Sequence, residues 1–250
     1  ELDYTYDQIL NFYLSEYNVT ISSGGITSIA GLEVKDTTNS NPIMINLEQY
    51  LLSNGSSIEE MNQFIYNSVE ESGKGTRAGV VTAAVSLINY LYDNFNSHIP
   101  YFWGGSYQYY GVNPDFGTKS NPSCSDTTCY YYLGLDCSGF VSWAIKNGGY
   151  NIGRYTTYSF HDAFSQNSCS IKDETCVGQP GDLINTRDSH VQLIVAVDEE
   201  SQKYIIAEST GSYGVIMREY DMHKSMFLKD TRILLMDDYY NNPNNVDPNY

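Results

Sequence analysis

Residues 135–149 read LDCSGFVSWAIKNGG, and this stretch decides the fold. Its apolar residues recur at helical spacing, at Phe140, Val141, Ala144 and Ile145. Gly148 and Gly149 follow them, and glycine is the favoured residue just past the end of a helix. The pattern predicts one helix that begins near Cys137 and ends at the Asn-Gly-Gly sequence.

Cys137 is predicted to lie on the inward face of the first turn, three and four residues before Phe140 and Val141. Backbone N–H groups at the start of a helix lack helical partners, and with the helix dipole they favour a thiolate. The same groups could hold the oxyanion that forms when a carbonyl is attacked. Cys137 is therefore a candidate nucleophile, although a cysteine that simply packs in the core fits its position equally well.

Two strand-like runs follow, HVQLIVAV at 190–197 and KYIIAES at 203–209, separated by the polar turn DEESQ. Alternation predicts that the first run presents one face made of Val191, Leu193, Val195 and Val197, and a second made of His190, Gln192, Ile194 and Ala196. If Val195 pairs with Lys203, Glu208 lies directly across from His190. A slip of two residues would leave them diagonal neighbours.

This placement makes His190 the candidate base, with Glu208 as the carboxylate that orients its imidazole. The alternatives are an ordinary surface histidine and a solvated charge at a strand end. Three other histidines compete for the role of base, namely His98, His161 and His223. They fall in loops or turns without a facing carboxylate, so we expect them to be surface or loop residues.

The remaining pattern predicts an α+β fold, in which helices precede a mainly antiparallel sheet. Ser57 and Glu60 have capping-box spacing before one helix, and a second helix is predicted from about Thr76. GVIMREY at 214–220 and TRILLM at 231–236 are further strand candidates. We expect a segment or appendage at 1–56, a catalytic domain at 57–237 and a disordered tail at 238–250.

The five cysteines divide into two short pairs and one that stands apart. Cys124 and Cys129 flank one polar loop, and Cys169 and Cys176 flank another, whereas Cys137 has no close partner. We expect two disulfides, which indicate an oxidising, extracellular compartment. The alternatives are reduced thiols, or zinc at the loop cysteines, although these spacings are wider than a zinc knuckle and no nearby histidine pair completes a site.

The net charge of the chain argues against two classes of binding partner. A net charge of −17 opposes the phosphate contacts of nucleic acids and repels anionic lipid surfaces, so neither is an expected partner. No run approaches the roughly 20 apolar residues that cross a bilayer, and the chain opens on Glu1 and Leu2 rather than a basic, apolar leader. We expect an export signal, if there is one, to have been removed or left out. No cofactor or metal is expected, and we expect a monomer.

Four motifs together resemble the NlpC-type cell-wall peptidases, which are papain-like cysteine enzymes. The motifs occur in that family's order, as YFWGG at 101–105, LDCSGFVSWA at 135–144, PGDLI at 180–184 and SHVQLIVAV at 189–197. The resemblance implies secreted or wall-associated hydrolysis of the γ-D-glutamyl bond to the diamino acid in bacterial peptidoglycan stem peptides. It also implies Cys137 as nucleophile, His190 as base, and a substrate site that includes Tyr101, Trp103, Asp136 and Ser138.

The third catalytic position departs from the family. Those enzymes commonly carry a histidine, asparagine or glutamine where this chain has Ile206, and isoleucine cannot orient an imidazole. With Glu208 as the third residue, the set Cys137, His190 and Glu208 resembles instead the Cys-His-Glu arrangement of CHAP-type enzymes. An N-acetylmuramoyl-L-alanine amidase or a cross-bridge endopeptidase is therefore the nearest alternative function. A papain-like toxin acting on host proteins and an inactive wall-binding module are more distant alternatives.

Overall fold

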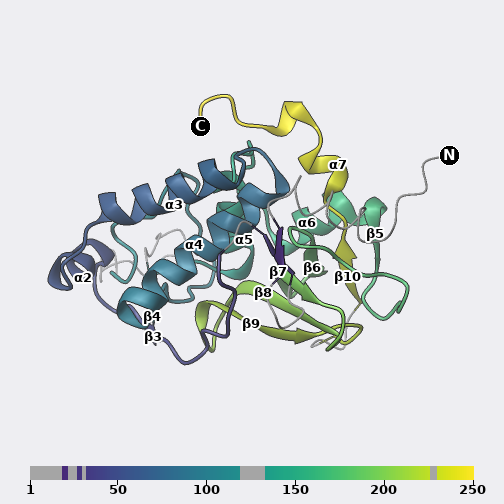
Figure 1. Cartoon of the computed structure of the whole chain (residues 1–250), viewed down its shortest axis with the longest axis horizontal. Coiled ribbons are helices and arrows are strands. Elements are labelled where there is room, and N and C mark those ends of the chain that lie inside the picture. The colour runs from purple at the N-terminus through teal and green to yellow at the C-terminus, as the bar shows by residue number, and fades with distance from the viewer. Residues whose placement is uncertain (1–18, 22–26, 30–31, 119–132, 226–229) are drawn as a thin grey trace.

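The computed structural model describes residues 19–21, 27–29, 32–118, 133–225 and 230–250. It confirms the α+β class (Figure 1). Along the chain, most of the helices come first and the strands of an antiparallel sheet follow. The helices are α2 (Leu47–Ser53), α3 (Ile58–Ser72), α4 (Arg77–Phe95), α5 (Cys137–Asn147), α6 (Thr157–Phe164) and α7 (Asp237–Tyr240), with short 3-10 turns η1 (Ser165–Asn167) and η2 (Pro243–Asn245). In the described part of the chain, no helix combines the length and apolar character needed to cross a bilayer.

The two helices predicted upstream of Cys137 are confirmed. Ser57 and Glu60 form the capping box that begins α3, each side chain accepting from the other residue's backbone N–H at 3.1 Å. Thr76 is the N-cap of α4, and its side chain accepts from Gly79 N. Helix α4 is buried around nearly its whole circumference between Ala78 and Leu91, and it is therefore the central helix of the layer.

Six antiparallel strands form the sheet in the order β5-β10-β6-β7-β8-β9. Two short strands, β1 (Val19–Ile21) and β2 (Thr27–Ile29), extend it where β2 pairs with the end of β7. A separate parallel pair joins β3 (Asn41–Pro42) to β4 (Ser97–His98). The six main strands are β5 (Ser168–Ser170), β6 (Leu183–Thr186), β7 (His190–Asp198), β8 (Lys203–Thr210), β9 (Gly214–Asp221) and β10 (Thr231–Leu234).

A β-bulge in β7 changes the predicted register. Leu193 pairs with Ala207 and Ile194 with Ile206, but the next pair is Ala196 with Ile205, which leaves Val195 unpaired. Lys203 accordingly pairs with Asp198 rather than with Val195.

The bulge also corrects the predicted alternation. Val195 and Ala196 both pack in the cluster beneath the helices, whereas Val197 packs on the opposite face with Ile194. Continuing the Leu193–Ala207 register by one residue places Gln192 across from Glu208. His190 is then a diagonal neighbour of Glu208, which is the slipped alternative.

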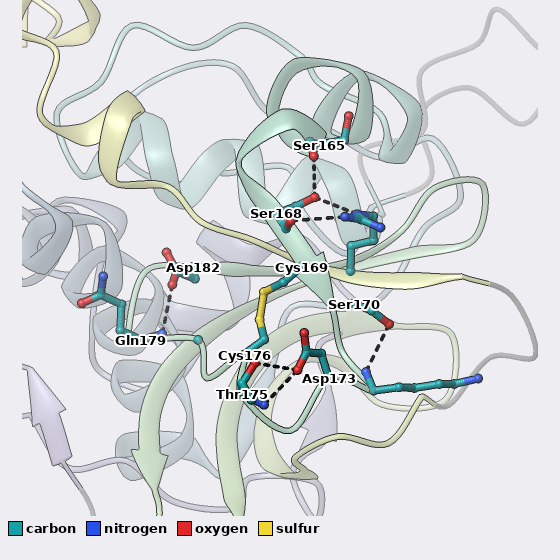
Figure 2. Close-up of a disulfide and its surroundings, with 12 residues drawn as sticks. Ser165, Ser168, Cys169, Ser170, Asp173, Thr175, Cys176, Gln179 and Asp182 are labelled. Carbon is teal, nitrogen blue, oxygen red and sulfur yellow. Dashed lines mark hydrogen bonds between the residues drawn. A yellow bond between two sulfur atoms is a disulfide. The ribbon is translucent and has the colours of Figure 1, made fainter.

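The face of the sheet that points away from the helices, with Ile194 and Ile206, is covered in part by a disulfide loop. Cys169 lies on β5 and is bonded to Cys176, whose Cα lies 6.2 Å away, and both pack against the apolar cluster that contains Ile194 and Ile206 (Figure 2). This confirms one predicted disulfide. Cys124 and Cys129 lie outside the described residues, and Cys137 is a free, buried cysteine.

Segments outside the predicted catalytic domain contribute to its packing. Leu47 and Leu51 of α2 are fully buried in the main core cluster, within the stretch that the sequence assigns to an appendage. The stretch predicted as a disordered tail instead contains α7 and η2 and continues across the helical layer (Figure 1). Tyr150 Oη donates to Tyr240 O at 2.9 Å, and Tyr250 Oη donates to Asn147 O at 2.7 Å. Tyrosines thus anchor a segment whose composition alone is that of a loop.

A buried carboxylate fastens the sheet to α4. Asp182 is fully buried, and it accepts from Arg77 Nη1 at 2.8 Å, from Met236 N at 2.9 Å and from Gln179 N at 3.0 Å. Each of these donors lies in a different part of the chain, so a single side chain holds three segments together.

We predict that Asp182→Asn lowers the free energy of unfolding by about 2 kcal/mol, because the buried hydrogen bonds lose their charged acceptor and Arg77 keeps only the exposed Asp237 as ionic partner. The control is Asp162→Asn, which removes an exposed partner of Arg187 and should cost less than about 1 kcal/mol. Urea denaturation of both variants measures the difference. Equal losses would contradict the role assigned to Asp182.

Candidate active site

Cys137 is the first residue of α5, and Asp136 is the N-cap of that helix. Asp136 Oδ1 accepts from Gly139 N at 2.6 Å and from Ser138 Oγ at 2.9 Å. Its Oδ2 accepts from Gly104 N at 3.1 Å. The capping carboxylate therefore fixes both the start of the helix that carries Cys137 and the aromatic loop at 101–105 beside it.

Glycines in the two motifs permit this close approach. A Cβ on Gly139 would lie 2.1 Å from Gly105 O, and one on Gly105 would lie 2.2 Å from Gly134 O. Both distances are far below any normal contact, and in each case the obstacle is backbone that cannot move aside. The glycines of DCSGF and YFWGG are thus required by the packing of the loop against the start of α5.

His190 opens β7 and hydrogen-bonds to both other members of the predicted triad. Its Nε2 lies 2.5 Å from Glu208 Oε2, and its side chain also hydrogen-bonds to Cys137. Because Nε2 is engaged by Glu208, Nδ1 is the ring nitrogen that remains for the thiol. The structure therefore brings together Cys137, His190 and Glu208 from one helix and two adjacent strands.

Glu208 is fully buried and has two further partners that the sequence analysis missed. Gln192 Nε2 donates to Glu208 Oε2 at 2.8 Å, and Arg218 Nε on β9 donates to Glu208 Oε1. Burial raises the pKa of Glu208, but His190 and Arg218 outweigh it, so the net pKa lies below its usual value. The available signal was a charged residue, Arg218, directly after the apolar residues 215–217, and this signal does not identify Glu208 as the partner.

The surroundings of His190 favour its protonated form. Burial lowers the pKa of His190, whereas its hydrogen bonds and charge interactions with Cys137 and Glu208 raise it, to about 9. The imidazole therefore carries a proton at neutral pH. A protonated imidazole stabilises a thiolate beside it and can later donate to a leaving group.

The four residues expected to contact substrate differ in exposure. Burial, together with the charges of Cys137 and Asp136, raises the pKa of Tyr101 to about 12, so its hydroxyl stays protonated beside the thiol. Trp103 is 82 % exposed, in contrast to the fully buried Trp143. Asp136 and Ser138 lie at the start of α5, where three of the roughly four acceptor positions of the Asp136 carboxylate are already used.

The competing histidines lie on other elements. His98 is on β4, where its Nδ1 lies 2.9 Å from Ser40 Oγ and burial lowers its pKa to about 4. His98 is thus a buried residue, which corrects the expectation of a surface one. His161 lies on α6 and His223 in the turn after β9. Among the described residues, no group of three or more His, Cys, Asp or Glu side chains is arranged to hold a metal ion.

A thiol at a helix start, hydrogen-bonded to an imidazole on an antiparallel sheet, is the arrangement of a papain-like cysteine hydrolase. The sequence model of the NlpC/P60 family matches residues 98–233, which is more than half of the chain, and the chain belongs to this family. The family consists of cysteine peptidases that act on peptidoglycan, and the protein is accordingly a cell-wall peptidoglycan hydrolase. No curated protein and no solved structure matched the chain in the corresponding searches.

We predict that Glu208→Gln lowers kcat at least about tenfold and moves the upper limb of the pH profile from near pH 9 to lower pH. The limb moves to lower pH because the Glu208 carboxylate raises the pKa of His190, so that without the carboxylate the imidazolium loses its proton at a lower pH. Gln192→Ala keeps the carboxylate and should change both quantities much less. Clearance of purified sacculi over a range of pH measures kcat and the upper limb for both variants. Equal, small effects would show that another group orients His190.

Proposed function

We propose that this protein is a cysteine endopeptidase that cleaves peptidoglycan stem peptides at the γ-D-glutamyl-diamino acid bond. Cys137 is the nucleophile, His190 the general acid and base, and Glu208 the group that orients His190. The observation that carries the proposal is the hydrogen-bonded row Cys137–His190–Glu208 at the start of α5, in a member of a peptidoglycan peptidase family.

The geometry supports a two-step hydrolysis. Cys137 Sγ adds to the carbonyl carbon, and His190 gives its proton to the departing amine, so that a thioester remains on the enzyme. Water then attacks the thioester with His190 as base, releasing the carboxylate and restoring the thiol. Gly139 N donates to Asp136 Oδ1 and Phe140 N to Asp136 O, which leaves the N–H groups of Cys137 and Ser138 at the helix start to stabilise the oxyanion.

The proposed specificity rests on residues beside the thiol. Asp136 retains about one free acceptor position, and its negative charge suits the protonated amino end of a stem peptide that begins with L-alanine. Tyr101 and Ser138 complete this pocket, and the exposed ring of Trp103 lies on the same loop as Tyr101. A peptide still joined to muramic acid has no free amine for Asp136.

The proposed setting is the wall outside a bacterial cell, with the enzyme acting as a monomer. The disulfide between Cys169 and Cys176 supports an oxidising compartment. The division into a segment at 1–56 and a catalytic domain at 57–237 stays a prediction, as does a bond between Cys124 and Cys129.

One observation favours a second candidate function. The third residue of the row is Glu208, whereas Ile206 lies in the apolar cluster opposite Ile194, so the arrangement resembles that of CHAP-type amidases and cross-bridge endopeptidases. Glu208 is fully buried and contacts the base, so it does not select the bond. The pocket residues beside Cys137 therefore carry more weight than Glu208.

We predict that digestion of muropeptides releases an L-Ala-D-Glu dipeptide from stem peptides with a free amino end, and that muramic-acid-linked peptides are cut more slowly. The charge of Asp136 is the physical reason, so Asp136→Asn should reduce the preference between the two substrates, whereas Asp115→Asn, on another loop, should preserve it. Mass spectrometry of the products measures both effects. Release of intact stem peptides from the sugar would identify an amidase and refute the assigned bond.

A further inference from the structure

We propose that Arg218 is a positioning residue for catalysis, because its Nε holds Glu208 Oε1 and so directs Glu208 Oε2 to His190. This inference rests on the proposed function, in which His190 is the base. It extends the row of interacting side chains from three members to four, with Arg218 contributed by β9. Arg218 acts through Glu208 and is assigned no contact with substrate.

The two carboxylate oxygens of Glu208 have different partners. Oε1 accepts from Arg218, and Oε2 accepts from Gln192 at 2.8 Å and lies 2.5 Å from His190 Nε2. With one oxygen held by Arg218, the carboxylate cannot rotate without breaking a charge-assisted hydrogen bond. The oxygen that faces His190 is thereby fixed in place.

The register of the strands places Arg218 within reach of Glu208. Glu208 pairs with Ile216 and Ile206 pairs with Arg218, so Arg218 is a diagonal neighbour of Glu208 on one side. His190 is its diagonal neighbour on the other side, across β7. Glu208 thus sits between two cationic side chains on the two flanking strands, where diagonal neighbours remain within reach of long side chains.

The positive charge of Arg218 also favours the ionised form of Glu208. Glu208 has no exposed surface, and burial of an isolated carboxylate favours its neutral form. The charged groups that contact Glu208 among the described residues are His190 on β7 and Arg218 on β9, while the side chain of Gln192 is neutral. Because an arginine side chain is a permanent cation, Arg218 favours the ionised form of Glu208 even when His190 gives up its proton during the reaction.

The experiment compares Arg218→Met with Arg218→Lys and with a matched control, Arg232→Met. Arg232 lies on β10, is 28 % exposed at its side chain against 20 % for Arg218, and donates to Ser168 instead of to the active site. Two readouts are taken. One is the pH profile of sacculus clearance, with kcat and KM, and the other is the titration of Glu208 by carbon NMR, assigned with Glu208→Gln.

We expect Arg218→Met to lower kcat about tenfold or more with KM changed less than about twofold, and to move the acid limb upward by about one pH unit. The midpoint of the Glu208 titration should rise by a similar amount, because the carboxylate loses a cationic partner. Arg218→Lys retains the charge without the Nε geometry, so its acid limb should stay close to wild type while kcat is intermediate. In a Glu208→Gln background, Arg218→Met should have little further effect.

The outcomes separate the two proposals. If Arg218→Met leaves the Glu208 midpoint and the acid limb in place, or loses no more activity than Arg232→Met, Arg218 is only structural and the inference is wrong. Additive effects in the Glu208→Gln background would overturn it as well. A shifted Glu208 midpoint in an enzyme that does not cleave peptidoglycan would instead overturn the proposed function, while the link between Arg218 and Glu208 would stand.

Discussion

The carboxylate of Asp136 joins the two halves of the site, because it accepts from the first turn of α5 through one oxygen and from the aromatic loop through the other. The loop passes so close to the helix start that Gly139 and Gly105 admit no side chain without a backbone clash. Cys137 is consequently presented at a fixed point, next to the end of β7 where His190 begins the strand. The sheet supplies the remaining members of the row, His190 on β7, Glu208 on β8 and Arg218 on β9.

Charges alternate along the row behind Cys137. Arg218 is cationic, Glu208 anionic, and His190 holds a proton because its partners raise its pKa to about 9. Each buried charge is matched by an opposite neighbour, which is the condition under which burial is tolerated. This local balance is independent of the net charge of −17 on the whole chain.

Much of the fold and the centre of the site could be predicted because local patterns set them. Helical spacing around Cys137, the capping box at Ser57 and the strand alternation that begins at His190 all act over a few residues. The exact pairing could not be predicted, because the bulge at Val195 is a tertiary feature that shifts the register within β7. Even so, the contact between His190 and Glu208 tolerated the shift, since diagonal neighbours across a sheet remain within reach.

The missed features depend on contacts between distant segments. Arg218 meets Glu208 only once β8 and β9 have paired, and nothing in the sequence around Arg218 names that partner. The polar composition after 237 predicts disorder, yet the hydroxyl groups of Tyr150 and Tyr250 hydrogen-bond this segment to the helical layer. The anchoring comes from single tyrosine hydroxyl groups and packed rings. The average composition of the segment cannot predict such individual contacts.

The central claim is that the sulfur of Cys137 performs the reaction, and the most direct measurement is clearance of purified sacculi by Cys137→Ala beside the wild type. We predict no clearance by the variant, with a circular dichroism spectrum and thermal unfolding close to those of the wild type. We also predict that iodoacetamide inactivates the wild type in proportion to the labelling of Cys137. Clearance by the folded Cys137→Ala variant at the wild-type rate would contradict the account.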